Sequence, residues 1–320
     1  MKTTAFTNND TEKKELPFVD LNIISPINIM ITGSNGQLGQ ELINSFKTGK
    51  CEIGEIPQSL RVANIFPVDI YEVDICNQNQ VISFCRKNDI TIIINCAAYT
   101  NVDKCEKDQD SAFKVNSIGP RNLAIVSEKL GIKLIHISTD YVFDGKNSQH
   151  YREWDICNPK NIYGSTKYMG EQYVQSFCSK YLIIRTSWLY GYVGNNFVKS
   201  IINKAKLGEP FKVVNDQFGC PTNANDLVYH ILKLVDANEC GLFHCSGNGQ
   251  CSWYDFALKI MEYSNIECDI IPCTTQEFPT LAKRPKFSVI DNMMLRCTVG
   301  DEMRNWKYAL QEYIDKIFKE

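Results

Sequence analysis

The sequence predicts an α/β protein with a doubly wound parallel sheet and a second, smaller lobe of mixed α/β structure. Up to residue 186, short apolar segments of strand length alternate with longer segments whose apolar residues have helical spacing. A glycine-rich turn follows the first of these strands and precedes a helix. Strands that alternate with helices in this way pair in parallel, with helices on both faces. The chain has 320 residues, enough for one large α/β domain or two smaller lobes with cores.

The expected elements follow in chain order. Strands are expected over residues 28–32, 65–68, 90–95, 133–138 and 181–185, and helices over 40–46, 78–87, 111–130 and 163–176. The segment 111–130 predicts a long helix, because its apolar residues recur mostly every three to five positions. After residue 186 the pattern loosens, with helices expected over 196–205, 225–235 and 252–263 and extended pieces over 211–214 and 241–245.

These elements suggest a division of the chain into lobes. Residues 1–26 are polar and mixed in charge, and we expect a flexible extension there. Residues 27–185 are expected to form a dinucleotide-binding domain, to which 215–245 return. Residues 186–214 and 246–320 are expected to form the substrate-binding lobe.

Composition excludes several classes of partner. The 34 Lys and Arg residues are balanced by 37 Asp and Glu residues, so no basic excess predicts a nucleic-acid surface. The longest apolar runs are of strand length, too short to span a bilayer, and no membrane contact is expected. The first residues lack the apolar core of a signal peptide, so a cytoplasmic location is expected. None of the 14 cysteines forms a C-x-x-C pair, and we expect no metal site and mostly buried, reduced thiols.

The turn at residues 33–39 predicts a dinucleotide site. Gly33 allows a tight turn, Gly36 lets a phosphate approach backbone N–H groups, and Gly39 lets helix and strand pack closely. The amino end of the following helix offers its partial positive charge to a pyrophosphate. We therefore expect a Rossmann-type cofactor site here. The other expected cofactor contacts in this turn are Asn35, Gln37 and Leu38.

A second motif predicts activation of a carbonyl group. Tyr163 and Lys167 lie four residues apart, on one face of the expected helix. A nearby ammonium stabilises phenolate, so Lys167 is expected to bring the pKa of Tyr163 toward neutrality. Thr139 ends a predicted parallel strand, where ligands of such sheets bind, and is placed to hold a carbonyl oxygen. A bare Y-x-x-x-K is common by chance, and its context here favours a catalytic Thr139, Tyr163 and Lys167.

The G-x-x-G-x-x-G spacing resembles that of the extended short-chain dehydrogenases/reductases, and the resemblance covers nearly the whole chain after residue 27. It implies NADPH or NADH as cofactor, with Tyr163 and Lys167 close to it and Lys167 on the nicotinamide ribose. Asp69, at the end of the second strand, suits a ribose 2′-hydroxyl and disfavours a 2′-phosphate. The other contacts implied by the resemblance are the adenine contacts Asp74 and Ile75 and the small-residue turn Ala97, Ala98 and Tyr99.

Within that superfamily, several stretches resemble the dTDP-4-dehydrorhamnose reductases. They are residues 95–103, 138–145, 185–191, 216–222 and 283–288. Dehydratases of the superfamily carry Glu where this chain has Tyr141, which favours plain carbonyl reduction. The resemblance implies that Thr139 and Asp140 contact the sugar, that Trp188 lines its pocket and that Arg284 reaches the diphosphate. The resemblance is not traced through residues 296–304, and the acidic metal-binding positions of some members are not identified.

The resulting hypothesis is hydride transfer from NAD(P)H to C4 of dTDP-4-dehydro-β-L-rhamnose, the last step of dTDP-L-rhamnose synthesis, with Tyr163 protonating the oxygen. Two alternatives stay open. One is a non-catalytic subunit like the regulatory β subunit of methionine adenosyltransferase, which shares the Tyr/Lys pair. The other is a reductase or epimerase of another nucleotide sugar, such as a UDP-linked one. The choice between dTDP and UDP, the choice of cofactor and the formation of a homodimer also stay open.

Overall fold

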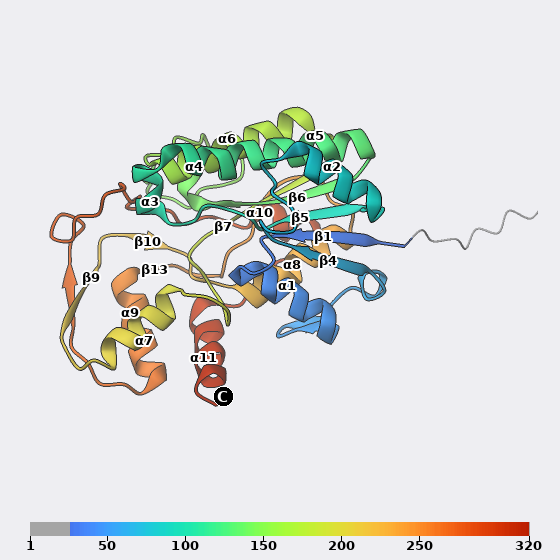
Figure 1. Ribbon diagram of the computed structural model, residues 1–320. Helices are drawn as coiled ribbons and strands as arrows, with labels where there is room; N and C mark the ends of the chain where they lie inside the picture. The colour runs from blue at the N-terminus through green and yellow to red at the C-terminus, as the bar shows by residue number, and fades with distance from the viewer. Residues whose placement is uncertain (1–25, 320) are drawn as a thin grey trace, which may run out of the picture.

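The computed structural model describes residues 26–319, so the extension expected over residues 1–26 falls almost entirely outside the described residues. A six-stranded sheet forms the centre of the described chain, and all of its strand pairs are parallel (Figure 1). In spatial order its strands are β12 (Gly241–His244), β7 (Tyr181–Thr186), β6 (Lys133–Thr139), β5 (Ile92–Asn95), β1 (Asn28–Thr32) and β4 (Asn64–Val68). The strand order reverses at β1, which pairs with β4 on one side and β5 on the other. The predicted doubly wound parallel sheet is confirmed.

Helices cover both faces of this sheet, because successive side chains of a buried strand point to opposite faces. Ile29 and Ile31 of β1 pack into one core, with the helices α1 and α8. Met30, between them, packs into the other core, with α2, α5 and α6. Figure 1 shows these two helical layers on opposite sides of the strands. The helices concerned are α1 (Gln37–Thr48), α2 (Gln78–Lys87), α5 (Gly119–Leu130), α6 (Ile162–Phe177) and α8 (Ala224–Asp236).

A separate apolar core holds the second lobe together. Phe256 of α9 lies at its centre, against Val198 and Leu310 of the neighbouring helices. The helices of this lobe are α7 (Phe197–Ala205), α9 (Trp253–Ser264) and α11 (Trp306–Ile317), and they lie below the sheet edge in Figure 1. Its strand pairs are β9 (Phe211–Val214) with β14 (Ile270–Cys273) and β10 (Phe218–Gly219) with β13 (Cys251–Ser252). The division of the chain into two lobes by residue number stays a prediction.

The remaining elements are short. They are the paired strands β2 (Lys50–Cys51) and β3 (Gly54–Glu55), the paired strands β8 (Leu189–Tyr190) and β11 (Thr222–Asn223), the helices α3 (Val102–Lys107), α4 (Gln109–Phe113) and α10 (Met293–Thr298), the 3₁₀ turns η1 (Gln58–Leu60) and η3 (Asp140–Val142), and the π-helical turn η2 (Lys114–Ile118). The helix expected over 111–130 therefore differs from the observed one, since η2 interrupts its α-helical hydrogen bonding. Helix α11 was not predicted, although its buried residues have helical spacing; they are Trp306, Leu310, Tyr313 and Ile314.

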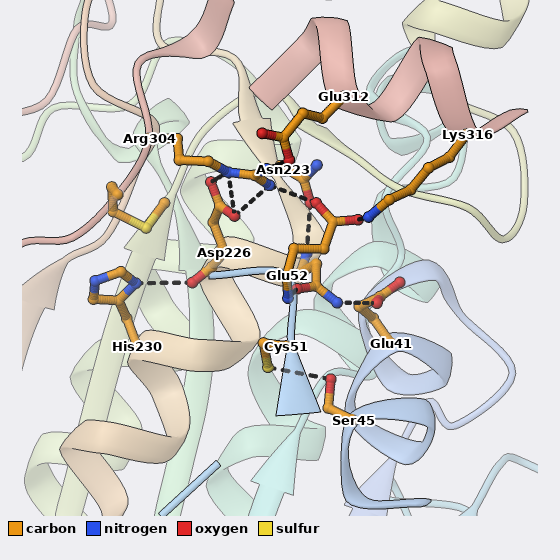
Figure 2. Close-up of polar contacts among 12 residues, drawn as sticks. Glu41, Ser45, Cys51, Glu52, Asn223, Asp226, His230, Arg304, Glu312 and Lys316 are labelled. Atoms are coloured by element: carbon orange, nitrogen blue, oxygen red, sulfur yellow. Dashed lines mark hydrogen bonds and ion pairs between the residues drawn. The ribbon is translucent and has the colours of Figure 1, made fainter. Parts of the chain in front are cut away.

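A cluster of charged side chains ties α11 to the rest of the molecule (Figure 2). Arg304 donates to Asp226 of α8 and, at 2.6 Å, to Glu52 of the β2–β3 turn. It also pairs with Glu312 of α11, and Lys316 of the same helix donates to Glu52 at 2.7 Å. Asp226 and Glu52 are almost fully buried, so the guanidinium supplies the charge that compensates them.

Candidate active site

The main cavity opens at the carboxyl ends of the sheet strands, where the strand order reverses. It has a volume of about 770 Å³. Ligands of open α/β sheets bind at such a place. The cavity is lined by the glycine turn after β1, by Thr139 and Asp140 after β6, by Tyr163 and Lys167 of α6, and by residues 186–189 and Trp253 from farther along the chain.

The glycine turn has the geometry that a dinucleotide site requires. Gly33 has φ +61°, and a Cβ there would lie 2.7 Å from the backbone nitrogen of Ala97. A Cβ on Gly39 would lie 2.4 Å from the carbonyl oxygen of Gly33. Helix α1 begins at Gln37, and among the described residues no side chain caps its first N–H groups. These groups face the cavity and fit a pyrophosphate.

The predicted cofactor contacts lie around this turn, with one exception. Asp69, Asp74 and Ile75 line the cavity, as do Gln37, Leu38 and the segment from Ala97 to Tyr99. Asn35 does not line the cavity, and its backbone N–H donates to the Asp69 carboxylate at 3.1 Å. The turn geometry explains this, since Asn35 is exposed on the outside of the turn.

Two neighbours of the cofactor site were missed in the sequence. Asn116, in the π-helical turn η2, accepts from the N–H of Tyr99 at 2.8 Å and donates to its carbonyl oxygen at 3.1 Å. It therefore fixes the segment that lines the cavity. The Gln37 side chain donates to the carbonyl of Leu189 at 3.1 Å and so joins the glycine turn to the strand that follows Trp188. A buried Asn in a helix is a signal that could have indicated the first contact, whereas nothing local indicates the second.

Thr139, Tyr163 and Lys167 meet at the cavity, as the sequence predicted, although their roles stay predictions. Thr139 Oγ1 donates to Asp140 Oδ1 at 3.0 Å and hydrogen-bonds the phenol of Tyr163. Tyr141 packs edge-on against Tyr163, with ring centroids 5.8 Å apart. Lys167 Nζ donates to the carbonyl oxygen of Ile137 at 2.6 Å.

The expected lowering of the pKa of Tyr163 is wrong for this structure. Burial raises the pKa of the phenol above its ordinary value, and the hydrogen bond with Thr139 opposes the increase only in part. Lys167 does not contact the phenol, because its ammonium is bound to the carbonyl of Ile137. Burial lowers the pKa of Lys167 to about 8, against the opposing charge of Glu171. Tyr163 is accordingly protonated at neutral pH, which is the form that donates a proton.

Asp140 lies beside this group with an unusual ionisation. It is 2% exposed, and its Oδ2 atom has no hydrogen-bond partner within residues 26–319. Burial raises its pKa to about 7, and hydrogen bonds from Ser288 and Thr139 limit the increase. Near neutral pH Asp140 is therefore present in both forms, one of which donates a hydrogen bond and one of which only accepts.

Trp188 lines the cavity, in a conformation that the sequence does not predict. Its φ is +46°, in the left-handed region that non-glycine residues rarely adopt. Its ring stacks on Trp253 with centroids 3.4 Å apart and planes 5° apart. A Cβ on Gly219 would lie 2.3 Å from the Trp188 indole, so glycine is needed there for the close approach. The strained backbone thus holds the stacked Trp188 ring in the wall of the cavity.

The structure does not bring Arg284 into the main cavity. Arg284 lines a second cavity of about 190 Å³, and Trp253 lines both cavities. Arg284 pairs with Asp103 at 2.9 Å. Its Nη1 atom is buried without a partner among the described residues. Lys204 and Lys212 line the same cavity, so three cations surround a space next to the two stacked tryptophans.

Comparison with known proteins identifies the family to which the chain belongs. The family described as RmlD substrate binding domain matches residues 27–318. The chain belongs to this family. The spore coat polysaccharide biosynthesis protein SpsK of Bacillus subtilis is 38% identical to it over 288 residues, 90% of this chain and 97% of that protein.

Two solved structures of dTDP-4-dehydrorhamnose reductases superpose on this member of the RmlD family. The one from Clostridium acetobutylicum is 45% identical, covers 91% of this chain and 100% of its own, and has a TM-score of 0.85. The one from Bacillus anthracis, in complex with NADP, is 42% identical, covers 91% of this chain and 99% of its own, and has the same TM-score. The predicted resemblance is confirmed. No helix among the described residues is long and apolar enough to cross a membrane.

Proposed function

We propose that this chain is an NAD(P)H-dependent dTDP-4-dehydrorhamnose reductase, which reduces the C4 keto group of dTDP-4-dehydro-β-L-rhamnose to the hydroxyl of dTDP-L-rhamnose. The meeting of Thr139, Tyr163 and Lys167 beside the glycine turn, within one cavity, carries this proposal. Membership of the RmlD family supports it, as do the names of the two superposed reductases. A nucleotide sugar is therefore the expected substrate.

Each residue of the cavity has a separate role in the proposed reduction. The cofactor, when bound on the glycine turn, supplies the hydride. The keto oxygen lies within reach of Thr139 and Tyr163, and Tyr163 donates its proton to that oxygen as negative charge develops on it. Thr139 orients the oxygen, and the Lys167 ammonium, which is bound to the carbonyl of Ile137 and does not contact the phenol, is proposed to supply positive charge to the cavity as the phenolate forms. Tyr141 stands where an eliminating Glu would be needed, so no water is lost.

The substrate is proposed to extend from the main cavity toward the second one. The sugar would lie against the stacked Trp188 and Trp253 rings where they line the cavity. The diphosphate would then approach Arg284, Lys204 or Lys212, whose charges are otherwise only partly compensated. The same proposal includes the choice of thymine over uracil as the nucleotide base of the substrate.

The test is oxidation of NADH and NADPH, followed at 340 nm, with dTDP- and UDP-linked 4-keto-6-deoxy sugars side by side. We expect turnover with the dTDP sugar and loss of more than about a hundredfold in kcat for Tyr163→Phe. Tyr173→Phe, on the same helix and outside the cavity, is the matched control and is expected to retain activity. Cofactor binding without turnover of any keto sugar would contradict the proposal and favour the non-catalytic alternative. A homodimer and a cytoplasmic location stay predictions.

A further inference from the structure

A buried ion pair lies directly behind the catalytic face of α6. Glu171 is fully buried, and both of its oxygens accept from Arg185 of β7, Oε1 from Nε at 2.9 Å and Oε2 from Nη2 at 2.7 Å. The Ser138 hydroxyl also donates to Oε1 of Glu171. Ser138 directly precedes Thr139 in β6. The carboxylate of Glu171 therefore connects α6, which carries Tyr163, to both β6 and β7.

The arrangement relates Glu171 to Lys167 as well. The two residues are four apart in α6, so both lie on the face that meets the sheet. The other groups that face the Lys167 ammonium are Cys96, after β5, and His136 of β6. His136 is neutral, because burial lowers its pKa well below the ordinary value, and burial also keeps the Cys96 thiol protonated. Glu171 is therefore the one acidic group among the described residues that acts on Lys167 near neutral pH.

We infer that Glu171 is a positioning residue for the proposed reduction: it locks α6 against β6 and β7 and keeps Lys167 in its charged form. Arg185 balances the charge of Glu171 from the side away from the cavity, in a bidentate geometry that fixes the carboxylate. The Arg185 guanidinium is itself held by the Sγ atom of Cys157 at 3.1 Å and lies over the Phe143 ring. This inference rests on the proposed function, since it assigns the charge of Lys167 a role in that reaction.

The direction of the expected pH effect follows from the charges. Burial lowers the pKa of Lys167 to about 8, and Glu171 raises it toward the ordinary value. Without the negative charge of Glu171, the pKa of Lys167 falls further. Lys167 then loses its proton at a lower pH, and activity that needs the ammonium declines at a lower pH. Side chains four residues apart on a helix lie about 5–6 Å apart at Cβ, and an opposite charge within about 4–6 Å changes a pKa by about one unit or more.

The experiment is the pH profile of kcat for Glu171→Gln between pH 6 and 10. We expect the alkaline limb to move down by about one unit, so that kcat at pH 8 falls about fivefold relative to the natural chain. Glu171→Asp, which keeps the charge, is expected to restore the limb. Glu128→Gln makes the same substitution on the exposed surface of α5 and is expected to leave the profile unchanged.

Removing Glu171 alone leaves the Arg185 charge buried, which could prevent folding. The double variant Glu171→Gln with Arg185→Gln removes both charges and is expected to show an alkaline displacement in the same direction but smaller, because loss of the Arg185 charge partly offsets loss of the Glu171 charge. An unchanged limb in both variants would overturn the inference. NADPH binding, followed by cofactor fluorescence over the same pH range, is expected to show the same displacement because Lys167 lines the cofactor cavity. A displacement in binding by a chain that reduces no keto sugar would overturn the proposed function and leave standing only the effect of Glu171 on the charge of Lys167.

Discussion

Asp140 shows how burial changes the chemistry of a single residue. In the sequence it is one of 37 acidic residues, distinguished only by its place after Thr139. In the fold it is 2% exposed and accepts from the Thr139 hydroxyl. Removal of a carboxylate from water disfavours its charged form, so the pKa rises to about 7.

We predict that Asp140 makes the protein less stable as pH rises. In the unfolded chain an Asp loses its proton near pH 4, whereas in the folded protein Asp140 keeps it up to about pH 7. Between these values the folded state binds more protons, so its contribution to stability declines as pH rises through that window. Asp140→Asn removes this pH-dependent loss, and between pH 5 and 8 it is expected to raise the free energy of unfolding by a few kcal/mol relative to the natural chain. Urea unfolding of both chains at pH 5 and at pH 8 measures this difference in the free energy of unfolding.

The control for this prediction is Asp110→Asn, at an exposed position of α4. We expect it to leave the difference between the two pH values unchanged. If Asp140→Asn also left that difference unchanged, the carboxyl of Asp140 would not be buried in solution as it is here.

At the scale of elements, α11 depends on contacts far from it in the chain. Its apolar face packs into the core of the second lobe, through Leu310 and Ile314. Arg304, just before its first turn, reaches Asp226 of α8 and Glu52 of the β2–β3 turn (Figure 2). The end of the chain is thereby joined to elements that flank the sheet.

We predict that Arg304→Met destabilises the protein by about 3–5 kcal/mol, because it leaves the buried carboxylate of Asp226 without a compensating charge and Glu52 with Lys316 alone. Lys233→Met breaks a more exposed pair with Glu302 and is the control, with an expected loss of about 1 kcal/mol or less. Urea unfolding followed by circular dichroism measures both. Equal losses in the two variants would show that the charge cluster does not hold α11.

At the scale of the whole molecule, the main cavity is shared between segments distant in the chain. Its lining includes the glycine turn near the beginning and Trp253 near the end. A ligand that fills the cavity therefore contacts several elements at once. Binding to the folded state alone stabilises it by mass action.

We predict that NADH and NADPH both raise Tm, by roughly 3–5 °C at about a hundred times Kd. Asp69 lines the cavity, and it is predicted to accept from a ribose hydroxyl and to repel a 2′-phosphate. Asp69→Asn is therefore expected to increase the Tm gain with NADPH relative to that with NADH, measured by thermal shift. Asp89→Asn, outside the cavity, is the control. If the difference in Tm gain between NADPH and NADH were unchanged in Asp69→Asn, Asp69 would not face the ribose.

Features that depend on local pattern were predictable. Strand and helix periods predicted the parallel sheet, since a short apolar run such as the one in Asn28–Thr32, all of it buried, is typical of a strand covered on both faces. The glycine spacing predicted the turn that Gly33 forms at φ +61°. The Tyr163 and Lys167 spacing predicted a shared helix face, because four residues make about one helical turn.

Features that depend on contacts between distant residues were decided only by the tertiary structure. Trp188 adopts a left-handed backbone because Trp253 and Gly219, from other parts of the chain, enclose its ring. Lys167 binds the carbonyl of Ile137 and leaves Tyr163 with a raised pKa, which reverses the expected effect. The sequence by itself thus determined the fold class and which residues meet at the site. Burial and long-range packing decided their charges and orientations, because the pKa of a group and the direction of a side chain are set by neighbours that the local sequence does not specify.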